Sequence, residues 1–345
     1  MSTIRLPIRL QRSFNNYASG ALSLCVVLGT GHNTWFQEHF VELHSYQIDR
    51  DGGVFWIDFN DTYAYREVLV THQLDLFEAD RITKVSSYLI DALDAGSYVI
   101  VFVDQSRLRA TPQPFLHELL IFGYDALDNV FLAVGFDDER PIRELTVPAA
   151  ALDSAYRSGI EQIKYSARWN KMTAVAQRLE PCVASGAPLN VAALLERMTR
   201  YLRPESPTGF DPYDGYWWYS RRSQVSDAVR VKYGLEVYDD ARAHVRAARD
   251  GLLRYDYRLI HILAEHKRMV LDRMGLALAA AGADPGTDDL FSAYRSLVAD
   301  VNRIRLAGLK FSTQNAQFPD GQTAALAAVA STEAKLLNAF IDAHD

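Results

Sequence analysis

The sequence predicts an α+β fold, in which an antiparallel sheet packs on a helix and an all-helical part follows. Short segments rich in Val, Ile, Phe and Tyr, each bounded by turn-forming residues, occupy the first half of the chain. After about residue 165 they give way to long charged and alanine-rich stretches. We therefore expect an α+β domain over residues 1–165 and a helical domain over residues 166–345.

The first half contains four segments with the composition of strands. Turn formers such as Gly52-Gly53 bound them. Their spacing favours a central antiparallel sheet, whose expected strands are residues 54–59, 98–104, 118–124 and 130–136.

Two helices are expected beside this sheet. Residues 17–28 place apolar side chains on every side, as in a buried helix, and Asn15 or Asn16 could cap the first turn. Residues 82–93 have one apolar face and precede the strand at residue 98. A buried helix against a sheet is the core expected of the first domain.

The second half has the periodicity of helices. In residues 255–278, Leu259, Leu263, Val270 and Met274 fall close to one stripe. Further helices are expected at about residues 170–201, 239–251, 286–309 and 320–343.

Composition and charge narrow the function. The chain has 345 residues, 49% of them hydrophobic, so it can build a substantial core. A net charge of −7 supplies no broad basic surface for nucleic acid or an anionic membrane. No apolar run has the length of a membrane span, and residues 21–28 are too short and too late for a signal peptide. We expect a cytoplasmic protein.

The cysteines give no sign of a structural scaffold. Only Cys25 and Cys182 occur, without metal-ligand spacing around either. The histidines of the first half likewise show no metal pattern, so surface or packing roles are expected for them. We expect neither a disulfide framework nor a bound metal, and we expect no cofactor.

The most informative segment begins at His117. An apolar run, residues 119–122, follows this histidine and ends in Gly123-Tyr124-Asp125. An imidazole at the mouth of a buried strand is how cysteine-protease-like folds present a general base. The alternative is a structural histidine bonded to the neighbouring backbone. The segment resembles the "H-x-(apolar run)-G-Y-D" strand of the family typified by the N-terminal domain of the butirosin biosynthesis H protein.

The resemblance extends over nearly the whole chain. The helical half reads Tyr233-Gly234-Leu235-Glu236-Val237-Tyr238, then Glu265-His266-Lys267 and Arg273. Family members, many of them associated with nonribosomal peptide or polyketide assembly lines, are similar there. The resemblance implies a papain/C39-peptidase-like fold and an acyltransferase that acts on acyl groups bound to a carrier protein.

The nucleophile that the resemblance implies is missing. The family carries "N-C-Y-x-S" at the start of its first long helix, where peptide dipoles favour a thiolate. Here the segment reads Asn15-Asn16-Tyr17-Ala18-Ser19, which puts Asn16 at the position of the cysteine. Asparagine has no labile proton and cannot act as that nucleophile. Cys25, nine residues later, falls on roughly the opposite helix face and is expected in the core.

The orienting carboxylate is displaced as well. In the family the strand after "G-Y-D" contains an aspartate within "F-Y-I-A-D-F". Here residues 131–136 put Gly135 at that position. Asp137 follows closely, and a slip of two residues keeps a side chain on the same face of a strand. The expected catalytic set is therefore His117, with Asn16 and Asp137 at the other two positions.

Four further residues are expected to contact substrate. Gln11 resembles a glutamine that supplies an oxyanion-hole amide in such enzymes, and Ser19 lies one helical turn beyond Asn16. Asp104 ends the strand 98–104, where the family tends to have an aspartate, and Tyr124 belongs to the G-Y-D motif. The plainer alternatives stay open: a solvated glutamine, a serine bonded to its own helix, and an aspartate facing solvent.

The charged residues of the helical half have two interpretations. Glu265, Arg268 and Asp272 have the spacing of ion pairs on a solvated helix face, and this is the interpretation that we prefer. The alternative is that His266 and Lys267 face the first domain and help to close its cleft.

Aromatic residues cluster between residues 213 and 219. Such a group more often fixes a long loop onto a domain interface, although it could also line a substrate tunnel or anchor a partner.

Three functions are compatible with this pattern. The first is a degenerate cysteine-peptidase-like protein of secondary metabolism, which binds an acyl or peptidyl intermediate, or its carrier protein, without covalent catalysis. The second is an enzyme that forms or rearranges an amide or ester on a carrier-bound substrate, with His117 as general base. The third is an interaction module whose helical half docks a partner enzyme. The expected partner is an acyl- or peptidyl-carrier protein, and a homodimer stays open.

Overall fold

The protein folds as a mixed α+β structure with an antiparallel sheet, as the sequence predicts. We describe it from a computed structural model. The residues described are 3–10, 20–48, 54–108, 113–135, 142–165, 172, 174–184, 186–205, 230–314 and 321–344.

The larger sheet runs in the order β4-β9-β5-β6-β7-β8. The strand β1, which is the first along the chain, pairs with β6. Every pairing in it is antiparallel. β5, β6, β7 and β8 follow one another along the chain, which suits antiparallel pairing, whereas β9 and β1 pair with strands that are distant in the sequence. The strands are β1 (Ile4–Arg5), β4 (Leu69–Leu74), β5 (Tyr98–Asp104), β6 (Leu116–Asp125), β7 (Val130–Gly135), β8 (Arg143–Pro148) and β9 (Ala176–Pro181).

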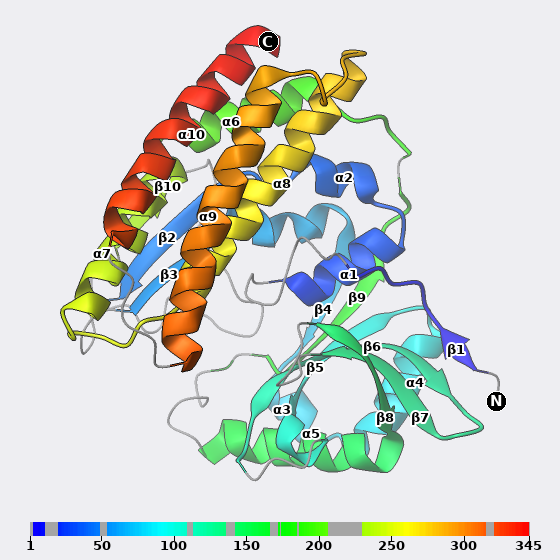
Figure 1. Cartoon of the computed structure of the whole chain (residues 1–345). Coiled ribbons are helices and arrows are strands. Elements are labelled where there is room, and N and C mark those ends of the chain that lie inside the picture. The colour runs from blue at the N-terminus through cyan, green and yellow to red at the C-terminus, as the bar shows by residue number, and fades with distance from the viewer. Residues whose placement is uncertain are drawn as a thin grey trace.

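Both faces of this sheet are covered (Figure 1). Alternate residues of β6 point to opposite sides, so Leu119 and Ile121 enter one core while Leu120 and Phe122 enter the other. The first core lies against α3 (Leu76–Asp80), α4 (Val85–Asp94) and α5 (Ala149–Tyr165). The second lies against α1 (Ala21–Gly29), whose residues 21–28 are all buried, as expected of a helix that is apolar all round.

The helical part is built around a small antiparallel sheet of order β10-β2-β3. Helix α8 packs on β3 and α9, while α10 packs on α9, α7 and α6. Figure 1 shows these long helices on the side of α1 that faces away from the larger sheet. The elements are α2 (Asn33–Glu38), β2 (Leu43–Ile48), β3 (Val54–Phe59), α6 (Val191–Leu202), β10 (Arg230–Tyr233), α7 (Val237–Arg249), α8 (Arg258–Ala280), α9 (Asp289–Gln314) and α10 (Gln322–His344), with short 3-10 turns η1 (Asn60–Glu67), η2 (Gln105–Arg107) and η5 (Gly234–Glu236).

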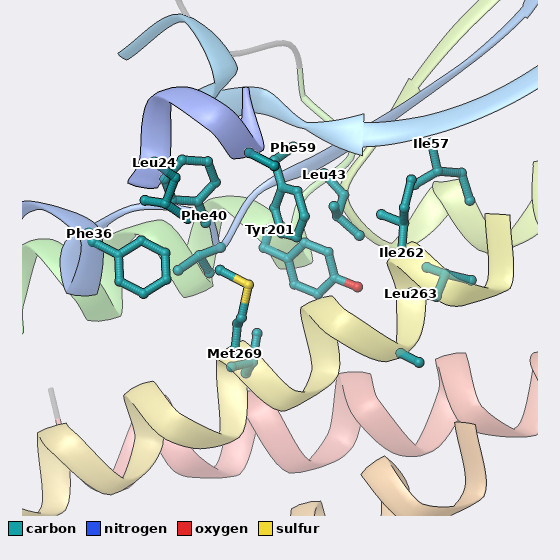
Figure 2. Close-up of a cluster of buried hydrophobic side chains, with 14 of the residues drawn as sticks. Leu24, Phe36, Phe40, Leu43, Ile57, Phe59, Tyr201, Ile262, Leu263 and Met269 are labelled. Carbon is teal, nitrogen blue, oxygen red and sulfur yellow. The ribbon is translucent and has the colours of Figure 1, made fainter. Parts of the chain in front are cut away.

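A continuous apolar core joins the two halves. Figure 2 shows Ile262, Leu263 and Met269 of α8 beside Phe59 of β3 and Leu24 of α1. These side chains belong to the same buried cluster, which also includes residues of the larger sheet and of α10. Separation of the two halves would therefore expose a large apolar surface to water.

Strands also cross the boundary expected at residue 165. β9 follows this residue in the chain, yet it lies between β4 and β5 in the larger sheet. β2 and β3 precede it, yet they pair with β10. Residue 165 therefore marks a change of composition rather than a division of the fold.

The helix expected at residues 170–201 is wrong in its first part, because β9 occupies residues 176–181 and the helix α6 begins only at Val191. β9 reads Ala-Gln-Arg-Leu-Glu-Pro, and its residues are buried or half-buried between two neighbouring strands without a strict alternation of polar and apolar residues. Helix α5, with its alanine-rich start, was assigned to no element by the sequence.

The described part of α1 begins later than predicted. Gly20 precedes the helix with a φ of 82°, a left-handed conformation that glycine tolerates. A side chain there would also meet the ring of Tyr65, whose hydroxyl donates to the Gly20 carbonyl at 2.9 Å. The helix α1 therefore starts at Ala21, and the expected caps Asn15 and Asn16 lie outside the described residues.

Among the described helices, α10 is the one whose length and apolar composition would let it cross a membrane. It buries Leu326, Leu337 and Phe340 within the bundle. Its Glu333 is also buried, in an ion pair with α8. The helix α10 thus packs one face on the bundle, and 28% of its apolar stretch is buried.

Candidate functional site

His117 lies near the beginning of β6, directly opposite Val103 of β5. Gln105 fixes this end of the strand, since its backbone N–H donates to the Phe115 carbonyl at 2.8 Å and its side-chain amide donates to the Glu118 carbonyl at 3.0 Å. The His117 side chain is 30% exposed. The imidazole is thus held on a rigid strand end that solvent reaches.

Two groups compete for Nδ1 of His117. The Glu118 backbone N–H lies 2.9 Å from this nitrogen, and the Glu118 carboxylate oxygen Oε2 lies 3.0 Å from it. A protonated Nδ1 can only donate to the carboxylate, and an unprotonated Nδ1 can only accept from the backbone N–H. The contact with the geometry of a hydrogen bond is the one in which the Glu118 backbone N–H donates to Nδ1, and the carboxylate pairs with this nitrogen only when it carries a proton.

Gly135 is the last residue of β7, and packing fills the place where an orienting carboxylate would stand. A Cβ built on this glycine would lie 3.1 Å from Cδ1 of Leu145 and 3.3 Å from Cγ of Leu119. Leu119 lies two residues from His117 along β6 and so shares its face. A side chain at position 135 would therefore contact leucine side chains, one of them on the face of β6 that His117 shares.

Asp104 has a structural set of contacts. Its carboxylate accepts hydrogen bonds from the backbone N–H groups of Ser106 and Phe115 and from the hydroxyls of Ser106 and Ser158, at 2.7–3.1 Å. Burial alone would raise the pKa of Asp104, but these hydrogen bonds outweigh it and lower the pKa. Alternation along β5 points Asp104 away from the side of Val103 and His117. The carboxylate thus holds the β5–β6 connection to α5, and its predicted ligand contact stays a prediction.

Tyr124 does not join His117. Seven residues separate them along β6, which is about 23 Å in an extended strand. The Tyr124 hydroxyl donates to the side-chain oxygen of Asn129 at 2.8 Å, across the turn that leads into β7. The two residues lie at opposite ends of the strand, and the predicted substrate contact of Tyr124 stays a prediction.

Four other predicted residues lie outside the described part of the chain: Gln11, Asn16, Ser19 and Asp137. The same holds for the aromatic segment at residues 213–219. Their roles remain predictions.

Cys25 is a core residue, as predicted. Its thiol donates to the Ala21 carbonyl at 3.3 Å within α1. Burial raises the pKa of this thiol to about 12, so it is not a thiolate at neutral pH. Cys25 therefore does not replace the missing nucleophile.

The most extensive polar cluster lies in the helical half, around Lys267 of α8. This side chain and Glu333 of α10 are both fully buried, and their charged atoms Nζ and Oε1 are 2.6 Å apart. Nζ also donates to the Tyr201 hydroxyl at 2.6 Å and to Nδ1 of His266 at 2.8 Å. All three ammonium protons therefore have acceptors. Burial lowers the pKa of Lys267 to about 8, although Glu333 opposes this shift.

Three tyrosines complete the shell of Glu333. Tyr201, Tyr238 and Tyr294 donate their hydroxyls to its carboxylate at 3.3, 2.9 and 2.8 Å. Burial, together with the negative charge of Glu333, raises the pKa of each hydroxyl well above 10. The cluster thereby ties α6, α7, α8, α9 and α10 together through one carboxylate.

His266 extends this cluster to the first half of the chain. Its Nε2 donates to the Val41 carbonyl just before β2, while Nδ1 accepts from Lys267. Burial, and then the charge of Lys267, lower the pKa of His266 well below its usual value, so the imidazole is neutral. Arg268 and Asp272 lie on the exposed face of α8, as the preferred interpretation expects, but Glu265 is buried and does not belong to that face.

The cluster predicts an unusual alkaline stability profile. Between pH 8 and 10.5 the unfolded chain binds more protons at Lys267 than the folded protein does, so this group raises the free energy of unfolding as the pH rises. Above pH 10 the three tyrosines keep protons that the unfolded chain loses, so they lower the free energy of unfolding. Cys25 has the same effect above pH 9. We expect the free energy of unfolding, measured with urea, to rise above pH 8 and to fall steeply above pH 10.

Two variants separate these contributions. Lys267→Met should lack the gain above pH 8, and Tyr294→Phe should make the loss above pH 10 shallower. A gain that persists in Lys267→Met would contradict the assignment to this lysine.

Sequence reasoning missed Glu333 and the three tyrosines. Glu333 stands among alanines and leucines in α10, and one carboxylate inside an apolar helix is a signal of a buried partner. The tyrosines carry no such signal, because their grouping depends on how five helices pack.

The described residues contain no group of three or more His, Cys, Asp or Glu side chains that could hold a metal ion. A scan of the chain against protein-family models finds no matching family, and a search of curated proteins finds no relative.

Proposed function

We propose that this chain is a degenerate cysteine-peptidase-like protein of nonribosomal peptide or polyketide biosynthesis. It binds an acyl or peptidyl intermediate, or the carrier protein that bears it, in the cytoplasm, and it forms no covalent bond to that intermediate. The observation that carries the proposal is the packed Gly135 beside the strand of His117: the imidazole is retained, while leucine side chains fill the place of its orienting carboxylate.

Three further features support this function. An antiparallel β5-β6-β7 sheet packs on α1, as the resemblance requires. Asn16 replaces the nucleophile in the sequence. Cys25 is sealed in the core with a raised pKa. Binding without covalent catalysis is the activity that such a site retains.

The proposal predicts binding without an adduct. The native protein, titrated with an acyl-pantetheine thioester, should release heat in calorimetry, and its intact mass should not change. The variant Asn16→Cys should gain a covalent acyl adduct that His117→Ala abolishes, because an engineered thiol at the ancestral position would be activated by the imidazole.

Asn15→Cys is the matched control, since it puts a thiol one residue away in the same segment. Equal labelling of the two cysteine variants would show that position 16 has no special relation to His117. An acyl adduct on the native protein would overturn the non-covalent function.

A second function is favoured by one contact. The Glu118 carboxylate, 3.0 Å from Nδ1 of His117, could orient the imidazole as a general base toward a carrier-bound substrate. Product formation by the native protein, lost in His117→Ala while binding persists, would favour this enzyme over the binding protein.

A further inference from the structure

The strand β4 lies at one edge of the larger sheet, and its outer side is open. Within the described residues, β4 pairs with β9 alone. Val70 is 49% exposed and the His72 side chain is 53% exposed, so side chains do not cover this strand. We propose that β4 pairs with β4 of a second copy of this chain, so that the two larger sheets join across a twofold axis. Such a dimer does not depend on the proposed function.

Alternate residues of β4 present their backbone to the open side. The Val68 carbonyl, just before the strand, accepts a hydrogen bond from the Cys182 N–H at 2.9 Å. The Leu74 carbonyl accepts one from the Val175 N–H at 2.9 Å. Because the register between β4 and β9 has no shift, the even-numbered residues bond β9 and the odd-numbered residues turn their N–H and C=O groups away from it. The residues that face the open side are Leu69, Thr71 and Gln73.

Free backbone groups on a sheet edge are a template for another strand, and β4 lacks the residues that block such pairing. It contains no charged residue, no proline and no glycine. The strand at the opposite edge, β8, begins with Arg143 and Glu144 and ends at Pro148. The Glu144 carboxylate also bonds Arg5 of β1 at 2.9 Å. Charges and proline protect the edge of β8, so β4 is the edge that suits a partner strand.

A second copy of the chain matches this edge in register. In an antiparallel pair, residues whose backbone groups face the partner must lie opposite one another. With Thr71 on the twofold axis, Leu69 lies opposite Gln73 of the partner subunit, and all the outward N–H and C=O groups are paired. An axis one residue away in either direction leaves the groups at one end unpaired. Val70 then lies opposite His72 of the partner subunit, so no two like charges meet, and the Thr–Thr pair on the axis is favourable in a sheet.

Analytical ultracentrifugation tests the dimer. As the concentration of the native protein rises to about 0.5 mM, a range in which even a weak interface is populated, its mass should rise from the 38.8 kDa of one chain toward twice that value. A mass of one chain throughout would overturn the proposal. In that case, a peptide ligand whose binding is lost in Gln73→Pro would be the partner of this edge instead.

Two charge variants on the axis identify the interface. Thr71→Lys and Thr71→Glu each place like charges directly opposite one another in the dimer, which is destabilising. We expect each variant alone to keep the mass of one chain, and an equimolar mixture of the two to regain the dimer, because lysine then faces glutamate. The regained dimer also shows that both variants are folded. Variants that dimerise alone as well as the native protein does, or a mixture that stays monomeric, would contradict pairing through β4.

An uncharged variant and a control on the other edge complete the test. Gln73→Pro removes an outward N–H, and proline is tolerated on the open side of an edge strand. It should weaken dimerisation about tenfold, because the dimer loses a hydrogen bond at each end of the paired strands. Thr146→Lys is the matched control, since it makes the same change as Thr71→Lys at an exposed position of β8, and it should leave the dimer intact. Loss of the dimer in Thr146→Lys alone would place the interface at β8 instead.

Discussion

Replacement of Glu333 by glutamine should lower the free energy of unfolding by about 3–5 kcal/mol, the cost typical of breaking a buried ion pair. The variant keeps the shape of the side chain but leaves the Lys267 ammonium without its counter-ion in a site that no water reaches. It also weakens the acceptor of three tyrosine hydroxyls. Urea unfolding followed by circular dichroism measures the change.

A double-mutant cycle separates the pair from its surroundings. Lys267→Met should also be destabilising, and Lys267→Met with Glu333→Gln should cost less than the sum of the two, because neither partner is then left charged alone. Glu196→Gln is the control: Glu196 bonds Arg200 at 2.8 Å on the exposed surface of α6, where a pair contributes less than about 1 kcal/mol. Additive costs, or a cost for Glu333→Gln as small as that of the control, would show that the buried charges are not coupled.

The main strands and several long helices could be predicted because their signals are local. β3 and β5 match the expected residues, and β6 and β7 differ from them by one or two residues at an end. Their composition and the turn residues around them suffice. β9 could not be separated from a helix by composition, because its charged residues lie on a half-buried strand whose neighbours come from distant parts of the chain.

The sequence predicts individual residues of the candidate site but not which of them contact one another. The sequence indicates His117, whose position at a strand end follows from its apolar run. It does not indicate Glu118 as the partner of Nδ1, because adjacent residues of a strand normally point to opposite faces. The separation of Tyr124 from His117 follows from the length of β6, which the motif alone does not convey. The buried role of Lys267 depends on Glu333, 66 residues away.

Replacement of Gly135 by aspartate, the residue that the resemblance implies at this position, should destabilise the protein by about 3 kcal/mol or more. The new side chain would enter a buried strand position where a Cβ alone already lies 3.1 and 3.3 Å from two leucine side chains, and overpacking of this kind typically costs about 1–3 kcal/mol. An unpaired carboxylate in apolar surroundings adds a further desolvation cost. Urea unfolding of Gly135→Asp measures the sum.

Gly135→Ala separates the two costs, since it adds the Cβ without the charge. We expect its cost to be at most about half that of Gly135→Asp, because the tips of Leu119 and Leu145 can move by a few tenths of an ångström. If Gly135→Asp is as stable as the native protein, position 135 has room for a carboxylate, and the observation that carries the proposed function is lost. If it is strongly destabilised while Gly135→Ala is not, apolar packing excludes a carboxylate at this position, as the proposed function requires.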